Sequence, residues 1–220
     1  MFERITAQPL FPSTIWIHEV KPDVAAPLND RLARTIDRLI SPKPPRGPGQ
    51  TWQTEARLHR LEEFRDLVAI FKAAAKGVLD RLEVDYGEFE ITGCWANVNP
   101  TGGVHPAHNH PNNYLSGVYY VQVPPGVDAI QFHDPRPHVT LIAPRVKRYN
   151  AHNSIVANVR VKPGQLILFP AWLVHSVEAN PSEHVRISVS FNVMFPDYVE
   201  RISYPKWDGI PLPREKVAGR

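Results

Sequence analysis

Hydrophobic positions recur at helical spacing in two segments of the first half of the chain. The first helix is predicted from Pro27, a residue suited to a first helical turn, to just before Pro42. A longer apolar stripe predicts a second helix over residues 61–82. Between the two helices, residues 41–50 are rich in proline and glycine, which excludes regular structure and makes this loop a candidate lid.

From residue 88 onward the pattern changes to short apolar or alternating runs that are broken by Gly, Pro and Asn. Together with a first strand predicted over residues 10–20, these runs predict a mostly antiparallel β architecture. The predicted strands cover residues 89–98, 116–123, 129–132, 139–142, 154–161, 165–169 and 185–194. The fold class is therefore mainly β, a barrel or jelly roll with the two helices packed on its outside.

Composition fits one domain. The chain has 220 residues, of which 43% are hydrophobic, enough for one sizeable core. We expect the N-terminal strand and supporting helices in residues 1–87, the jelly-roll core in residues 88–196 and a tail in residues 197–220. The single cysteine, Cys94, lies in an apolar run, which indicates a core residue rather than a nucleophile.

Charge and hydropathy restrict the partners. No apolar run is long enough for a membrane helix, and the N-terminus lacks the pattern of a signal peptide, so we expect a soluble cytoplasmic protein. The net charge is only +3 and the basic residues are scattered, which argues against a nucleic-acid partner. The sequence leaves a homodimer open.

Three of the six residues from 105 to 110 are histidines. Because side chains at i and i+2 of a strand share a face, His108 and His110 can reach one ion, and a distant histidine, His175, can complete the set. Imidazole suits iron, zinc, copper or nickel, and three protein ligands leave coordination positions open for chemistry. The alternative is a histidine-rich loop in solvent.

Four segments carry a family resemblance: Trp-Ala-Asn-Val at residues 95–98, His-Asn-His-Pro at 108–111, Pro-Gly-Gln-Leu-Ile-Leu-Phe-Pro at 163–170 and Arg-Ile-Ser at 186–188. They resemble the double-stranded β-helix oxygenases that use non-haem iron and 2-oxoglutarate, in particular a bacterial and phage branch. The resemblance is good over residues 95–195 and weaker before them. It implies the cofactors Fe(II) and 2-oxoglutarate, and hydroxylation of an unreactive C–H bond.

Carried over by motif, the family's first histidine falls on His108, its distal histidine on His175 and its oxoglutarate-binding arginine on Arg186. The physical argument agrees, because Arg186 and Ser188 share a strand face and can meet one carboxylate with a guanidinium fork and a hydroxyl. The alternative is that Arg186 pairs with a surface residue such as Glu183.

One departure from the family pattern concerns the third ligand. Most of these oxygenases carry Asp or Glu two residues after the first histidine, where this chain has His110. Three interpretations stay open. His108, His110 and His175 form an all-imidazole triad, or Asp134 supplies a carboxylate, or His105 replaces one of the neighbouring pair.

Further polar residues are candidates for contact with the cosubstrate. Asn97 and Asn113 are possible hydrogen-bond donors near the proposed centre. Tyr119 and Tyr120 point to opposite faces of a strand, and we select Tyr119 as the candidate donor to the distal carboxylate of 2-oxoglutarate. Turn capping explains Asn113 equally well, and core packing explains Tyr119. We expect no catalytic residue beyond the metal centre.

The sequence thus predicts an iron- and 2-oxoglutarate-dependent oxygenase of unknown substrate. Two other classes stay open: a cupin-like dioxygenase, isomerase or hydrolase that does not use oxoglutarate, and a non-catalytic binding barrel, against which Arg186 argues. The long connection over residues 137–158 is a candidate flap for reading the substrate.

Overall fold

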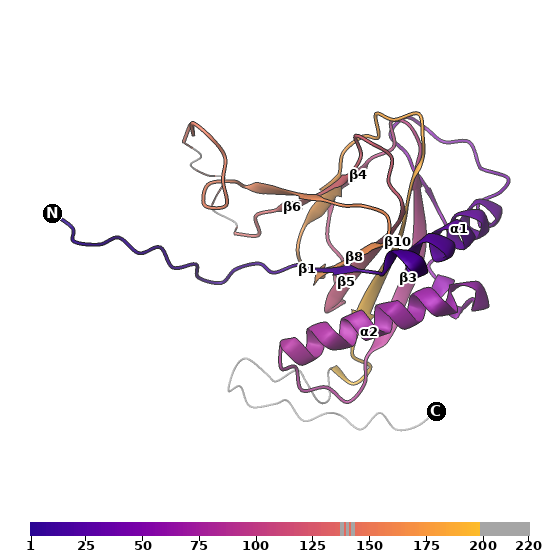
Figure 1. Ribbon diagram of the computed structural model, residues 1–220, viewed down its shortest axis with the longest axis horizontal. Coiled ribbons are helices and arrows are strands. Elements are labelled where there is room, and N and C mark those ends of the chain that lie inside the picture. The colour runs from indigo at the N-terminus through magenta and orange to yellow at the C-terminus, as the bar shows by residue number, and fades with distance from the viewer. Residues whose placement is uncertain (137–138, 140, 142–143, 199–220) are drawn as a thin grey trace, which may run out of the picture.

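Two antiparallel sheets face each other, and both long helices cover the outer face of the larger sheet (Figure 1). The computed structural model describes residues 1–136, 139, 141 and 144–198. The larger sheet has the strand order β1-β8-β5-β10-β3-β2, with bounds Trp16–Glu19, Gln165–Pro170, Leu115–Gln122, Arg186–Met194, Glu90–Asn99 and Trp52–Gln53. The smaller sheet has the order β4-β9-β6-β7, with bounds His105–His108, His175–Val177, Ala129–His133 and Val156–Arg160. The predicted jelly roll with outer helices is confirmed.

The helices bury their apolar stripes against the larger sheet. Helix α1 (Pro22–Leu39) begins before the predicted Pro27, because Pro22 occupies the first turn, where a missing N–H costs nothing, and Pro27 lies inside the helix. Helix α2 (Arg65–Arg81) begins after the predicted residue 61, since two short 3-10 turns, η1 (Leu58–Arg60) and η2 (Glu62–Phe64), precede it.

A second hydrophobic cluster fills part of the space between the sheets. The rings of Phe132 on β6 and Phe169 on β8 meet edge to face, with centroids 5.1 Å apart. The other buried members are Val118, Tyr120, Ile130, Val161, Ile167 and Leu173. Because these side chains come from both sheets, they fix the separation at which the remaining inter-sheet space forms a cavity.

Alternation along β10 decides what enters that cavity. Ile187, Val189 and Phe191 belong to the helix-side core. Since neighbouring residues of a strand point to opposite faces, Arg186 and Ser188 face the smaller sheet instead. One strand therefore supplies both the core and the floor of the cavity.

Some predicted boundaries differ from the structure. The first strand, β1, is shorter than the expected residues 10–20, and β4, β9 and the two-residue β2 were not predicted as strands. The strand expected over residues 139–142 and the tail expected over residues 197–220 lie largely outside the described residues. Within the described part of the chain, no helix has the length and apolar character needed to cross a membrane.

Candidate metal centre and cosubstrate site

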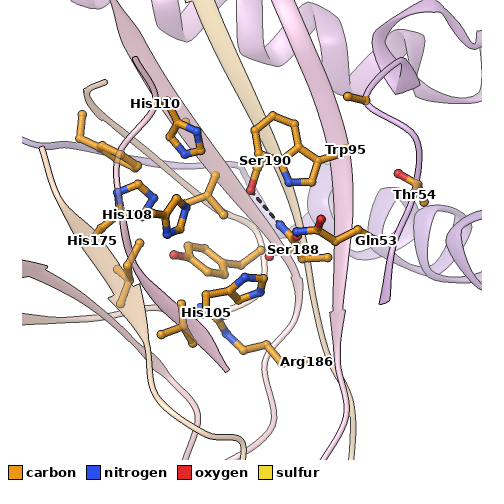
Figure 2. Close-up of a pocket in the computed structure, with 18 residues that line it drawn as sticks. Gln53, Thr54, Trp95, His105, His108, His110, His175, Arg186, Ser188 and Ser190 are labelled. Carbon is orange, nitrogen blue, oxygen red and sulfur yellow. Dashed lines mark hydrogen bonds between the residues drawn. The ribbon is translucent and has the colours of Figure 1, made fainter. Parts of the chain in front are cut away.

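Three histidines converge at the edge of the smaller sheet (Figure 2). His108 ends β4 and lies opposite His175, the first residue of β9. His110 follows beyond the end of β4, where its backbone N–H donates to the carbonyl of Ala171 at 2.9 Å. The candidate ligand atoms of the three side chains all lie within 4.8 Å of one another.

The geometry that joins His108 and His110 differs from the expected one. We expected both residues on one face of a strand, but β4 ends at His108 and has an irregular register between His105 and His108. His110 reaches the centre from the loop that follows. The two histidines therefore meet through a strand end and a turn, not through simple alternation.

The chain fixes the tautomers of two of these rings. Nδ1 of His108 lies 2.8 Å from the carbonyl oxygen of Pro106, and Nδ1 of His175 lies 3.0 Å from that of Leu173. A carbonyl oxygen only accepts, so each Nδ1 carries the proton and donates it. Nε2 of both rings is then left with a free lone pair, the form that binds a metal.

Burial keeps His110 and His175 uncharged. Desolvation lowers the pKa of His110 to about 4 and the pKa of His175 to about 3. At neutral pH both imidazoles are therefore neutral, and a metal ion does not have to displace a proton from them.

Neither of the two alternative ligands joins the cluster of three histidines. His105 lines the same cavity, but its Nε2 is 3.1 Å from Oδ1 of Asn99 and it does not join the cluster of three. Asp134 does not line the cavity. Its carboxylate accepts hydrogen bonds from Arg136, at 2.5 Å from Nη2 and 3.0 Å from Nε, and these bonds hold the pKa of Asp134 below its usual value.

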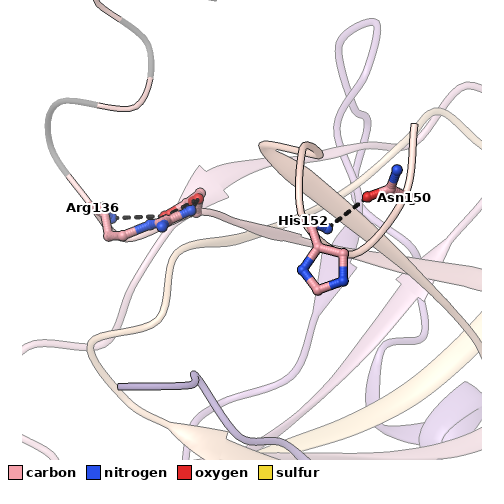
Figure 3. Close-up of polar contacts among 4 residues, drawn as sticks. Arg136, Asn150 and His152 are labelled. Atoms are coloured by element: carbon pink, nitrogen blue, oxygen red, sulfur yellow. Dashed lines mark hydrogen bonds and ion pairs between the residues drawn. The ribbon is translucent and has the colours of Figure 1, made fainter. Parts of the chain in front are cut away.

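Figure 3 shows local hydrogen bonds within the described parts of the connection between β6 and β7. Arg136 turns back on the neighbouring carboxylate, and the backbone N–H of His152 donates to Oδ1 of Asn150 at 2.8 Å. The expected flap over residues 137–158 includes positions outside the described residues. Its described part, including His152, does not line the cavity.

Arg186 lies at the far end of the cavity from His110 (Figure 2). Only 2% of its surface is exposed, and its guanidinium lies over the ring of Tyr120, 5.1 Å from the centroid. Nε of Arg186 and the hydroxyl of Tyr120 have no hydrogen-bond partner. No carboxylate of the described residues, Glu183 included, forms an ion pair with Arg186. Burying a cation without a partner costs free energy, so this site favours the binding of an anion.

Polar residues beside Arg186 continue the cavity floor. Ser188 is buried on the same face of β10. Asn97 on β3 is opposite Ser188, accepts a hydrogen bond from Nε2 of Gln53 at 2.7 Å, and donates to Oγ of Ser190 at 3.0 Å. The expectation that Asn97 lies near the site agrees with this placement.

Two expected cosubstrate residues need correction. The hydroxyl of Tyr119 donates to Oδ1 of Asn29 on α1 at 2.8 Å, on the helix side of the sheet. Asn113 does not line the cavity, and it accepts a hydrogen bond from Thr92 and donates to the carbonyl of Pro111. Tyr119 and Asn113 therefore have structural contacts, and neither faces the cavity.

The cavity has a volume of about 410 Å³, within the range of small-molecule sites. Sequence reasoning selected Tyr119 where Tyr120 lines the wall, and it missed Ser190 and Gln53. Tyr120 is opposite Ser188 in the register of β5 and β10, so strand pairing would have placed it on the cavity face. Ser190 continues the alternation from Arg186. No sequence signal marks Gln53, because β2 is only two residues long.

Comparison with known proteins agrees with this geometry. Residues 93–192 match the model of a family described as "Putative 2OG-Fe(II) oxygenase". Among curated proteins, no sequence matches the chain. The matched residues include all three histidines of the cluster, as well as Arg186 and Ser188.

Solved structures share the fold at low sequence identity. The α-ketoglutarate-dependent carbocyclase SnoK from nogalamycin biosynthesis has a TM-score of 0.60 at 15% identity, over 92% of this chain and 90% of its own. HygX from Streptomyces hygroscopicus, with nickel and 2-oxoglutarate bound, has a TM-score of 0.59 at 12% identity, over 82% of each chain. The epimerase SnoN, in complex with Fe³⁺, α-ketoglutarate and nogalamycin RO, has a TM-score of 0.59 at 14% identity, over 81% of this chain and 78% of its own. The jelly-roll core of this chain, residues 93–192, is thus similar to the 2OG-Fe(II) oxygenase family.

Proposed function

We propose that this chain is an iron- and 2-oxoglutarate-dependent hydroxylase in which His108, His110 and His175 hold the iron. The proposal is supported by three imidazoles that converge within 4.8 Å, two of them with a free Nε2. Imidazole is a normal ligand for non-haem iron, and three ligands leave open positions. When bound, iron and 2-oxoglutarate supply oxygen activation coupled to oxidative decarboxylation.

The observation that carries the cosubstrate assignment is the unpaired buried cation, Arg186. Its guanidinium binds the distal carboxylate of 2-oxoglutarate, and the hydroxyls of Ser188 and Tyr120 donate to the same group. All three side chains line the cavity from adjacent strands. Binding the carboxylate here satisfies donors that otherwise have no partner.

The remaining walls orient the ligand and exclude water. Phe169 and Val118 give one side an apolar surface, while the hydrogen bonds from Gln53 to Asn97 and from Asn97 to Ser190 fix the polar side. Held side chains do not have to reorganise when a ligand enters. We also propose that the chain forms a single domain. A cavity of about 410 Å³ suits a small-molecule substrate.

The direct test is cosubstrate turnover. With Fe(II) and oxygen, the purified protein should convert 2-oxoglutarate to succinate slowly even without a substrate, and Arg186→Ala should remove most of this turnover. Protein that binds iron at these histidines but neither binds nor converts 2-oxoglutarate would instead belong to the cupin-like class.

A further inference from the structure

The cavity wall carries an excess of positive charge. Among the described residues that line it, Arg186 has a permanent charge and no side chain is a carboxylate. His105, His108, His110 and His175 supply only imidazoles. Asp134, the acidic residue considered as a ligand, pairs with Arg136 outside the cavity. The described residues therefore bring no negative charge to the centre.

Loading the site with its cofactors leaves this excess in place. A divalent iron adds two positive charges to that of Arg186, and the three imidazoles must be neutral to bind it. The dianion 2-oxoglutarate cancels two of these three charges, so at least one remains. A carboxylate ligand at the place of His110 would have cancelled it. Such an uncompensated charge attracts an anion.

Hydrogen-bond donors that the cosubstrate does not use lie near His110. Trp95 on β3 is 5.7 Å from His110 between ring centroids, and its indole N–H has no partner among the described residues. Oγ of Ser190 accepts from Asn97, so its own proton is free to be donated to a ligand. Figure 2 shows Trp95, Ser190 and Gln53 on the wall across from His108 and His175.

We propose that the substrate is a small organic anion whose carboxylate lies between the three histidines and the wall formed by Trp95, Ser190 and Gln53. The proposal rests on the proposed function and adds the substrate class. It joins two independent observations, the missing negative charge of the cavity and the unused donors beside His110. A cationic substrate group would add to the excess charge, and a neutral one would leave it.

A groove that adjoins the cavity at Ala56 has the same sign. Ala56 belongs both to the cavity wall and to a shallow groove whose charged side chains are Arg57, Arg60 and Glu55. Two guanidiniums and one carboxylate thus line this groove. A positive surface beside the cavity raises the local concentration of an anion and speeds its association.

The test measures anion binding without turnover. The probes are acetate and propionate, compared with acetamide and propionamide, and the protein is loaded with zinc and 2-oxoglutarate. By calorimetry the two carboxylates should bind saturably in the millimolar range, and the amides at least about tenfold more weakly. Undetectable carboxylate binding, or equal binding of the amides, would overturn the proposal.

Variants locate the anion. Gln53→Glu places a negative charge on the wall and should weaken propionate binding about tenfold, while the uncharged control Gln53→Met should change it less. His110→Asp, which restores a carboxylate to the centre, should also weaken propionate binding while zinc stays bound. Propionate binding that is equal in wild type, Gln53→Glu and Ser190→Ala would mean that the anion sits on the metal alone, and the wall assignment would be wrong.

The failures of the two proposals can be told apart. The affinity for 2-oxoglutarate is measured first, in the wild type and in Arg186→Ala. If 2-oxoglutarate does not bind, the proposed function fails and the substrate proposal with it. If 2-oxoglutarate binds through Arg186 but carboxylates have no advantage over amides, only the substrate proposal fails.

Discussion

Arg186 is the residue that a bound anion would stabilise most, because its charge is buried without an ion-pair partner. It is the largest of the fully buried side chains, and burial lowers its pKa, although a guanidinium stays charged at neutral pH. Structures retain such a buried charge when something pairs with it. Among the described residues the guanidinium lies over the ring of Tyr120 and has no carboxylate partner, which favours an anionic ligand at this place.

Arg186→Ala should therefore weaken 2-oxoglutarate binding by about 2–5 kcal/mol, the cost of losing one member of a buried charge pair. Arg186→Lys should restore only part, since an ammonium cannot form the two-pronged contact of a guanidinium. Calorimetry on the three proteins measures this, with iron affinity as the control that should stay unchanged. Equal oxoglutarate affinities in all three proteins would remove Arg186 from the site.

The histidines predict how the metal-free protein responds to acid. The pKa of His110 is lowered to about 4 and that of His175 to about 3, whereas the unfolded chain has values of about 6.5. Between about pH 6.5 and pH 4 the unfolded chain binds protons that the folded chain does not, so stability falls as pH falls. Denaturant unfolding should therefore show the free energy of unfolding falling as the pH falls through this range. His175→Gln should flatten this dependence, and an unchanged slope would contradict it.

Among single residues, those that belong to a recognisable motif could be predicted from the sequence. A residue whose role depends on which face of the strand it occupies could not. His108, His175, Arg186 and Ser188 all face one cavity, as their motifs predicted. Tyr119 was selected over Tyr120 because alternation alone does not say which face of a strand is which. That choice follows only from the pairing of Tyr120 with Ser188.

Among the elements, the long strands were predictable and the short ones were not. β3 and β10 pack one apolar face on the helices, so every second residue carries a hydrophobic signal. β4 has four residues and β9 three, and their sequences are dominated by the histidines of the site. Their pairing depends on contacts that are distant in sequence, which local patterns do not record.

The contact between α2 and β10 leaves no spare room at Gly117. Phe71 and Phe191 stack with centroids 3.9 Å apart, and a Cβ on Gly117 would lie 2.3 Å from Cε1 of Phe191. Gly117→Ala should destabilise the fold by about 1–3 kcal/mol, because the stacked ring has no free space to move into.

Gly77 is the matched control, since its site in α2 is exposed and has nothing within 4 Å of an added Cβ. Gly77→Ala should stabilise by about 0.5–1 kcal/mol, the usual gain in a helix. Urea unfolding of both variants measures the two changes. A neutral Gly117→Ala would show that β5 and β10 adapt more easily than this packing indicates.

In the whole molecule, the two sheets contribute different halves of the site. The histidines come from the smaller sheet and its following loop, and Arg186 comes from the larger sheet. A cosubstrate held by both would link the sheets and bind only the folded chain. At a hundredfold excess over its Kd, 2-oxoglutarate should raise the free energy of unfolding of the zinc-loaded protein by about 2.7 kcal/mol. Arg186→Ala should lose this gain, and stabilisation that survives in this variant would place the cosubstrate elsewhere.

The central claim is that three histidines hold the iron, and metal binding tests it most directly. Anaerobic Fe(II) titration should give one site in the wild type, with affinity largely lost in His108→Ala, His110→Ala and His175→Ala. The control His133→Ala removes a histidine bonded to Ser176 outside the cluster and should bind iron normally. Iron affinity unchanged in His110→Ala, or lost in Asp134→Asn, would contradict the all-histidine centre.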